Sequence, residues 1–325
     1  MKLNRKNVRL GEEPSEIIWR LNKTSVSYFP AKRKKYQTPI LFIYSIINKP
    51  SILNLTPDSS VIKSFTNQGY DVYLLDFGSP GIEDKNIGLN EYILYIHKAV
   101  KRIVHHSGSH RISLFGYCLG GTFAAIYTSL YPTHIKNLIL FAAPIDFETL
   151  PFLNSWKKEW LHEKKHLLQS LKNEYGIIPA SFVKHGMKWL ISPFSITPKL
   201  AVLSDLSNED SVNRWISFNQ WLNDHIPMSG KVFQEFMNDL VTENKLVKNK
   251  LIIHGKRVSL KNIRCPMLVI TTENDTLVPK EMTFPIMKKV SSMDKKFLSI
   301  KGGHISIALR TNKPLDIFQW IEKRS

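Results

Sequence analysis

One short stretch limits what this chain can fold into. Residues 111–127 run from an apolar segment of strand length, through small residues, into a second apolar segment with helical spacing that stops near Pro132. Between the two segments lie Gly116, Cys118 and Gly120, which form the pattern Gly-x-Cys-x-Gly. The stretch therefore predicts a strand, a sharp turn and a helix, with one sulfur atom at the apex of the turn.

This arrangement is typical of the nucleophile elbow of the α/β-hydrolase fold, with cysteine in place of serine. Most free cysteines are small buried hydrophobes, but the flanking glycines and the strand–helix order favour Cys118 as a nucleophile. The backbone N–H of Leu119, directly after it, is expected to point into the site as one oxyanion donor. The second donor is expected from the loop after the apolar run 39–44, from either Ile46 or Ile47.

The rest of the chain predicts an α/β fold with a mostly parallel central sheet flanked by helices. Apolar runs of strand length, typical of buried parallel strands, occur at residues 39–44, 71–76, 137–142, 251–253, 266–271 and 297–300. Helical patterns occur at residues 59–68 and 89–105, and the N-terminal region predicts a short helix at 15–20 and a strand at 25–29.

The middle of the chain has a different character. Strand signals are absent from about residue 146 to residue 250, and many aromatic residues stand at helical spacing: Trp156, Trp160, Trp189, Trp215 and Trp221 all lie here. We expect most of them to pack in a core, and the segment to form a helical cap that keeps water out of a site beneath it. The predicted organisation is an N-terminal segment 1–37, a first part of the core 38–145, a helical cap insertion 146–250 and a second part of the core 251–325.

An elbow nucleophile needs a carboxylate and a histidine, which follow it in that order along the chain. Asp275 lies in the loop after a late strand, just before an apolar stretch that would re-enter the fold. Glu273 is a competing candidate, and a turn-forming Asp is the structural alternative. His304 follows two glycines on the last strand-to-helix loop, whereas the remaining histidines considered are expected to be surface or packing residues: His97, His105, His106, His110, His134 and His254. Cys118, Asp275 and His304 therefore form the predicted catalytic set.

Cysteine suits the transfer of an acyl group to a hydroxyl group. A thiol near pH 7 is only about a few per cent thiolate, and a neighbouring histidine raises that fraction. Attack on a thioester gives another thioester, so the first step is nearly thermoneutral and the bound acyl group stays activated toward an alcohol. A serine ester would leave little driving force for making a new ester. The sulfur thus indicates acyl transfer, for which a dry cap would be an advantage.

Length and composition indicate the size of the domain and the compartment in which the chain works. At 325 residues the chain suits one large α/β domain or a core with a sizeable insertion. Its two cysteines, Cys118 and Cys265, offer no disulfide framework and fit a reducing compartment. The sequence has no apolar run long enough to span a membrane and no signal-peptide pattern, so we expect a cytoplasmic protein. No metal ion is expected.

The formal charge of +18 predicts a field that attracts phosphates, acidic proteins or anionic surfaces. Nucleic acid is not the expected partner, because no recognition motif is present and the basic residues look scattered along the sequence.

Several segments resemble polyhydroxyalkanoate synthases of the α/β-hydrolase superfamily. The likeness is carried by residues 38–78, 116–122, 144–147, 223–228, 243–247 and 258–263, and it extends over most of the chain. The short region before the core resembles the class III and IV catalytic subunits, of PhaC type, which lack the long N-terminal domain of the larger synthases.

The resemblance implies polymerisation of (R)-3-hydroxyacyl-CoA into an intracellular polyester, with release of CoA. Carried over, Cys118 would hold the growing chain as a thioester, His304 would deprotonate the thiol and Asp275 would help to activate the incoming hydroxyl. The CoA thioester is then the substrate and no separate cofactor is implied. The implied partners are a second, PhaE-like or PhaR-like subunit, a second copy of the chain and the surface of polymer granules. The CoA phosphates would also give the positive field a purpose.

Two residues depart from the family pattern. Thr276 stands where the family usually has histidine, and Phe77 where it usually has tryptophan. These departures bear on the level of activity more than on the fold.

The alternatives to a polymerase are a cysteine hydrolase of the same fold, either a thioesterase or a polyester depolymerase, and a catalytically weak homologue associated with polymer granules.

Overall fold

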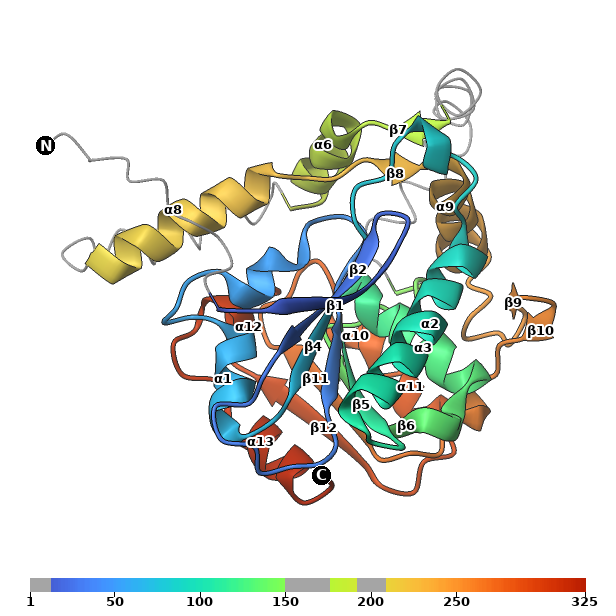
Figure 1. Cartoon of the computed structure of the whole chain (residues 1–325). Coiled ribbons are helices and arrows are strands. Elements are labelled where there is room, and N and C mark those ends of the chain that lie inside the picture. The colour runs from blue at the N-terminus through green and yellow to red at the C-terminus, as the bar shows by residue number, and fades with distance from the viewer. Residues whose placement is uncertain (1–12, 150–175, 192–208) are drawn as a thin grey trace, which may run out of the picture.

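The computed structural model describes residues 13–149, 176–191 and 209–325 (Figure 1). Within these ranges the core is one eight-stranded sheet with the order β1-β2-β4-β3-β5-β6-β11-β12. Six neighbouring strands, from β4 to β12, are parallel, and β2 and β1 are added antiparallel at one edge. The strands are β1 (Glu16–Leu21), β2 (Thr24–Phe29), β3 (Ile40–Ile43), β4 (Val72–Asp76), β5 (Ile112–Tyr117), β6 (Ile135–Phe141), β11 (Met267–Thr272) and β12 (Lys295–Ile300).

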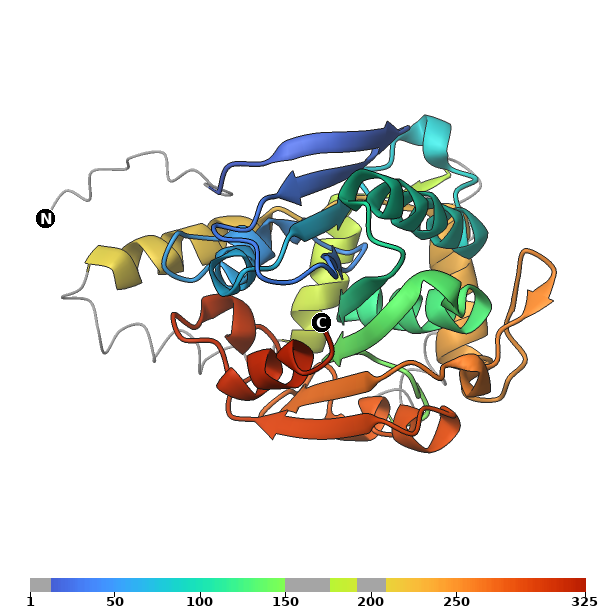
Figure 2. The same ribbon diagram turned by 60° about the horizontal axis from the view of Figure 1, so that its bottom comes forward.

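Helices cover both faces of this sheet (Figures 1 and 2). On one face lie α1 (Val61–Gln68) and α13 (Leu315–Glu322), whose Phe65 and Phe318 rings are 4.9 Å apart. On the other face lie α2 (Leu89–Ser107) and α3 (Leu119–Leu130), which pack against each other. Short helices complete the second half of the core: α10 (Lys280–Thr283), α11 (Ile286–Lys289) and α12 (Ser306–Leu309).

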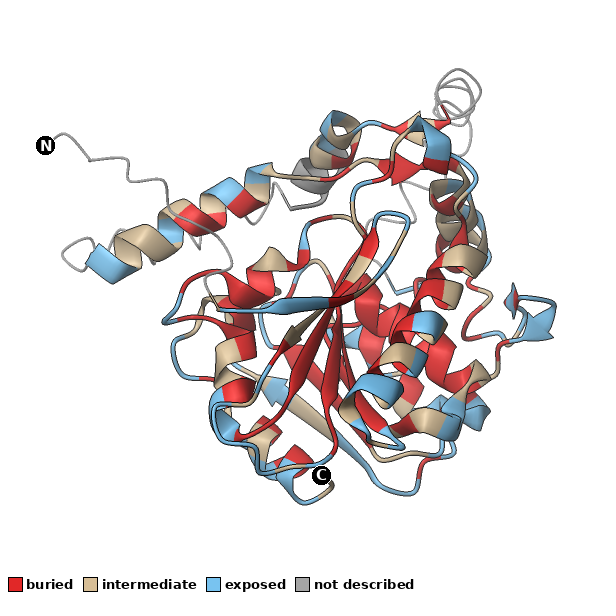
Figure 3. Ribbon diagram, viewed as in Figure 1, coloured by how far each residue is buried: buried red, intermediate tan, exposed pale blue. Residues whose placement is uncertain are grey.

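The centre of the sheet is the centre of the hydrophobic core. Every residue of β3, β5 and β11 is buried, whereas the edge strand β12 is exposed or half-buried along its whole length (Figure 3). This is the pattern of parallel strands covered on both faces, and it explains why the predicted strands read as continuous apolar runs. The Phe42 ring stacks on Phe115 at 4.7 Å and contacts Phe65, which joins the sheet to α1.

The predicted α/β architecture is confirmed, with two local corrections. The helix predicted at residues 15–20 is wrong, because these residues form β1 and pair with β2 across a tight turn at Asn22. β-branched and aromatic residues such as Ile18 and Trp19 favour strands over helices, and β2 supplies the hydrogen-bonding partner that a strand needs. The strand predicted at 251–253 exists as β9 (Ile252–Ile253), but it pairs only with β10 (Lys256–Arg257) in a separate hairpin.

The described part of the middle segment is mainly helical. It contains α6 (Ala180–Ile191), α8 (Glu209–Asn223) and α9 (Gly230–Glu235), followed by a π-helical turn at Phe236–Thr242, and one short strand pair that was not predicted, β7 (Ile177–Ile178) with β8 (Met228–Ser229). α6 and α8 lie at the top of Figure 1, above the core. Trp221 is buried as predicted, Trp215 is 40% exposed, and Trp156, Trp160 and the Trp189 side chain lie outside the described residues.

The division into an N-terminal segment, two core parts and a cap stays a prediction. In the described ranges no helix has both the length and the apolar character needed to cross a membrane.

Candidate active site

Cys118 stands at the apex between β5 and α3. Its backbone has φ 55° and ψ −132°, a conformation that L-residues rarely adopt and that marks functional positions. The Cys118 N–H donates to Phe141 O at 3.0 Å, and its carbonyl accepts from Gly121 N at 2.8 Å. Strand β6 on one side and the first turn of α3 on the other thus hold the strained residue in place.

The elbow glycines are required by close approach. A Cβ on Gly116 would lie 2.5 Å from Gly121 Cα, and a Cβ on Gly120 would overlap the carbonyl group of Ile43. Both collisions involve backbone, which cannot rotate away as a flexible side chain does. The first turn of α3 therefore packs directly on the end of β3, which brings the loop after β3 next to Cys118.

Asp275 and His304 meet beside the elbow. His304 Nδ1 lies 2.8 Å from Asp275 Oδ2, and the side chains are 13% and 0% exposed. Asp275 Oδ1 accepts from the backbone N–H groups of Leu277 and Val278 at 3.0 and 2.8 Å. Two backbone donors and the imidazole thus satisfy this buried carboxylate, which fixes the orientation of the ring.

Cys118 lies on the other side of the same imidazole. Burial acts to lower the pKa of His304, but the negative charges of Asp275 and of the Cys118 sulfur, with hydrogen bonds that the ring donates to both, raise it well above 6.5. Because Nδ1 is engaged with Asp275, Nε2 is the ring nitrogen left for the thiol. The three residues that the sequence predicted are therefore brought together, and the raised pKa favours the imidazolium form of His304.

Two tyrosines missed by sequence reasoning line this site. The buried Tyr117 donates its O–H to the backbone carbonyl of His304, and its ring lies 5.7 Å from the imidazole. Burial, and then the charge of Cys118, raise the pKa of Tyr44, so its hydroxyl stays protonated beside the sulfur. Nothing in the sequence distinguished these residues from ordinary core aromatics, because their roles depend on contacts across the sheet.

The backbone donors expected for an oxyanion come directly after Cys118 and from the loop after β3. Leu119 is the first residue of α3, where N–H groups have no acceptor within the helix. The Ile47 N–H is already bonded to Ser45 Oγ at 3.2 Å, whereas the Ile46 N–H has no hydrogen-bond acceptor among the described residues. This difference favours Ile46 over Ile47, and both assignments stay predictions.

The C-terminal end of α8 and the segment after it hold the loop after β3. Trp221 Nε1 donates to Lys49 O at 2.8 Å, and the Ile226 N–H donates to Ile47 O at 3.4 Å. The Trp221 ring also contacts Tyr44, with ring centroids 6.4 Å apart. The loop that carries the expected second oxyanion donor is thus fixed by the middle segment of the chain.

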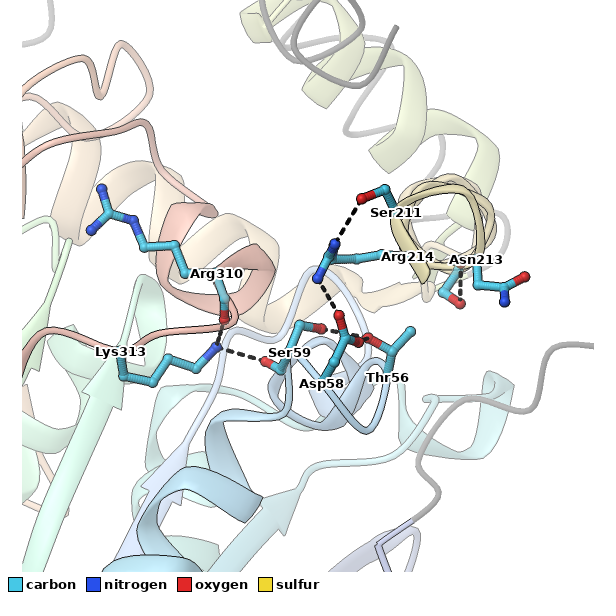
Figure 4. A network of polar contacts seen from close by, with 9 residues as sticks. Thr56, Asp58, Ser59, Ser211, Asn213, Arg214, Arg310 and Lys313 are labelled. Carbon is cyan, nitrogen blue, oxygen red and sulfur yellow. Dashed lines mark hydrogen bonds and ion pairs between the residues drawn. The ribbon is translucent and has the colours of Figure 1, made fainter. Parts of the chain in front are cut away.

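A polar network joins the other part of α8 to the core (Figure 4). Arg214 on α8 forms an ion pair with Asp58. Beside it, the buried Lys313 donates to the carbonyl groups of Ser59, at 2.7 Å, and of Arg310. Burial lowers the pKa of Lys313 to about 7, while Asp58 acts to raise it. α8 therefore contacts the core through Arg214 and, nearer its C-terminal end, through Trp221.

The other residues singled out from the sequence differ in burial and in surroundings. Glu273 and Thr276 are exposed, and Phe77 is buried against Tyr92 with ring centroids 5.0 Å apart. Burial raises the pKa of the Cys265 thiol to about 12. Among the described residues no group of three or more His, Cys, Asp or Glu is arranged to hold a metal ion.

Comparison with known proteins places this site in a family. The model of the alpha/beta hydrolase fold family matches residues 38–311. The chain is 30% identical over 311 residues to the poly(3-hydroxyalkanoate) polymerase subunit PhaC of Allochromatium vinosum, covering 94% of this chain and 86% of that one. The chain belongs to the PhaC family of α/β hydrolases. It is also 33% identical to the PhaC subunit of Haloferax mediterranei, over 98% of this chain but only 65% of that longer relative, and 30% identical to PhaC of Haloarcula marismortui, 70% of which it spans.

Solved structures agree on the fold. A monoglyceride lipase variant from Saccharomyces cerevisiae is similar with a TM-score of 0.59 at 13% identity, over 98% of this chain and 96% of that one. The monoacylglycerol lipase of Paleococcus ferrophilus gives 0.57 at 16% identity, over 94% and 100%. At such low identity these lipases support the α/β-hydrolase fold of this PhaC family member and say nothing of its substrate.

Proposed function

We propose that this chain is the catalytic subunit of a poly(3-hydroxyalkanoate) polymerase, which joins (R)-3-hydroxyacyl groups from CoA thioesters into a polyester and releases CoA. The observation that carries the proposal is a cysteine, not a serine, at the apex of the elbow and beside a His304–Asp275 pair, in a chain whose curated relatives are named PhaC. The CoA thioester is the substrate, and no separate cofactor is needed.

The first step is acylation of Cys118. The thiolate attacks the thioester carbonyl, a new C–S bond forms, and the negative charge moves to the carbonyl oxygen, which the Leu119 and Ile46 N–H groups are proposed to stabilise. Collapse of this intermediate breaks the bond to CoA, and the His304 imidazolium gives its proton to the departing CoA thiolate. The products are an acyl-enzyme thioester and CoA thiol, with a neutral imidazole.

The second step is attack by a hydroxyl group. The neutral His304 takes the proton of the 3-hydroxyl of an incoming hydroxyacyl-CoA while its oxygen attacks the enzyme thioester. An ester bond forms, the bond to Cys118 breaks, and the thiolate–imidazolium pair is restored. Because the Asp275 side chain has no exposed surface, it helps to activate the hydroxyl through the imidazole and not by direct contact. The lengthened chain then acylates Cys118 again and releases its CoA.

The test is an assay of CoA release from 3-hydroxybutyryl-CoA with the wild-type chain, alone and with candidate second subunits. We expect CoA release together with insoluble polyester. Free 3-hydroxybutyrate without polymer would instead identify a thioesterase, and absence of turnover under all conditions would identify an idle homologue. The PhaE-like or PhaR-like partner, the homodimer and the granule location belong to the same proposal.

Two cysteine variants test the nucleophile. Cys118→Ala should lower CoA release by at least about 10³-fold, since the covalent intermediate is lost. Cys265→Ala should keep most of it, because Cys265 precedes β11 as a packing residue. Retained turnover in both variants would exclude Cys118 as the nucleophile.

A further inference from the structure

Two long stretches of this chain contain no acidic residue. Residues 92–145 and 244–272 have no Asp or Glu, although the whole chain has 27 of them. Both stretches do contain Lys, Arg and His at many positions. Along the sequence these cations look scattered, and only the fold can show whether they meet.

The fold brings the two stretches together. α2 and α3 contact the hairpin β9–β10 and the short helix η7 (Leu260–Asn262) from the second stretch. Lys256 Nζ lies 5.3 Å above the Tyr131 ring, whose centroid is 4.5 Å from that of His97. At the two ends of this contact, the His254 N–H donates to Asn90 Oδ1 at 2.8 Å, and Asn262 Nδ2 donates to Ser129 O at 3.1 Å.

We define the basic face as the exposed cations along this junction: Lys101, Arg111, Lys250, Lys256, Arg257, Lys261 and Arg264. Arg111 joins the set because its charge acts on the pKa of Cys265, the neighbour of Arg264 in the sequence. No member of the basic face forms an ion pair with a carboxylate of the described residues, whereas cations elsewhere do, such as Lys23, Lys34 and Arg324. The positive charge of this face is therefore uncompensated within the described molecule, and it attracts an external anion.

One apolar side chain stands out among these charges. Ile252 on β9 is 61% exposed, between Lys250 and the cations of β10. The hairpin projects from the body of the molecule (Figures 1 and 2). His254 and Gly255 both have positive φ, 49° and 71°, as in the two-residue turns that make stiff hairpins. A stiff projection thus presents an exposed aliphatic side chain whose cross-strand partner is Arg257.

We propose that the basic face docks on a surface of anionic phospholipid headgroups, with Ile252 entering the interface between headgroups and acyl chains. Juxtaposed lysines and arginines attract such a surface, and a buried aliphatic group adds a contribution that salt does not screen. Single-stranded nucleic acid fits less well, because it needs free aromatic rings for stacking and the Tyr131 ring is covered by His97 and Lys256. The proposal is independent of the catalytic assignment.

Co-sedimentation with vesicles tests this docking. We expect the full chain to bind vesicles of 30% phosphatidylglycerol and 70% phosphatidylcholine, and not vesicles of phosphatidylcholine alone. The double variant Lys256→Glu/Arg257→Glu should lower the partition coefficient at least about tenfold, given the contribution of each basic residue near an anionic surface. Ile252→Ser should weaken binding that persists at high salt.

The matched control is Lys32→Glu/Arg33→Glu, which makes the same change of charge at two exposed cations outside the basic face. It should keep binding within about twofold of the wild-type chain. Equal loss in both double variants would overturn the proposal in favour of net charge alone. Absence of binding to the anionic vesicles would also overturn it, as would tight binding of RNA or polyglutamate by a chain that ignores the vesicles. Because sedimentation does not require turnover, these outcomes are separate from the CoA-release assay.

Discussion

At the scale of single residues, the two thiols differ in chemistry more than in exposure. Cys118 is 8% exposed and Cys265 is half-buried, so access alone would favour Cys265. With a pKa of about 12, however, Cys265 is thiolate to about one part in 10⁵ at pH 7. A low dose of iodoacetamide at pH 7 should therefore modify Cys118 first, as mass spectrometry of peptides would show. Faster modification of Cys265 would contradict the proposal that Cys118 is the nucleophile.

The His304 imidazole offers a direct measurement of the same pair. Its pKa is held well above 6.5 against the effect of burial, by Asp275 and by Cys118. Asp275→Asn and Cys118→Ala should each lower this pKa, because each removes a negative charge and a hydrogen-bond partner from the ring. NMR titration of the ring protons checks this, with His304→Gln to assign the signal. An unchanged titration in Asp275→Asn would mean that the pair is not formed in solution.

At the scale of elements, the approach of α3 to β3 sets the geometry of the site. Gly120→Ala would place a methyl group on the Ile43 carbonyl, so α3 would have to move away from β3. We expect a loss of stability of about 1–3 kcal/mol together with a large loss of CoA release. Thermal unfolding measures the first effect. The stability control is Gly303→Ala, where the nearest atom to a new Cβ is Asn274 O at 3.6 Å, and a similar loss there would remove the explanation by close approach.

The contact of α8 with the loop after β3 makes a second prediction for an element. Trp221→Phe keeps an aromatic ring against Tyr44 but removes the hydrogen bond to Lys49 O. A hydrogen bond of this kind is worth about 1 kcal/mol, so the single-turnover rate of Cys118 acylation should fall about three- to tenfold. KM should change little, since the loop is proposed to stabilise the oxyanion and not the ground state.

The matched control for this prediction is Trp215→Phe, on the same helix but 40% exposed, which should leave acylation unchanged. An equal effect of both variants on the rate would show that α8 acts only through stability.

At the scale of the whole molecule, Lys313 links the pH to the stability of the chain. Its pKa is about 7 in the folded state and about 10.4 in an unfolded chain. Between these values the unfolded chain holds a proton that the folded chain lacks, so this group makes stability fall as the pH is lowered from 10.4 to 7. Below pH 7 both states are protonated and the effect is constant.

Thermal unfolding of the wild type and of Lys313→Met should show this dependence as a difference. The wild type should lose more stability than the variant between pH 9.5 and pH 7. Lys296→Met, at a half-exposed position paired with Asp316, should follow the wild type. Parallel curves for wild type and Lys313→Met would show that the ammonium is charged throughout this range.

The sequence by itself determined the elements of the core and the position of Cys118, the proposed nucleophile, at a sharp turn. Buried parallel strands must be apolar at every position, and the elbow must have small residues at fixed places, so both leave local patterns at residues 111–127 and along β3, β4, β6 and β11. The order Cys118, Asp275, His304 was also readable, because each lies just after a strand at the edge where carboxyl ends meet.

Only the tertiary structure decided what depends on contacts between distant segments. The strand β1 was misread as a helix because its pairing with β2 is not encoded in its own residues. The hydrogen bond of Tyr117 to the His304 carbonyl and that of Trp221 to the Lys49 carbonyl likewise join groups far apart in sequence. The cations of the basic face likewise come from two stretches far apart in sequence, which only the folded chain brings together. Periodicity reports which side of an element is buried, but not which partner covers it.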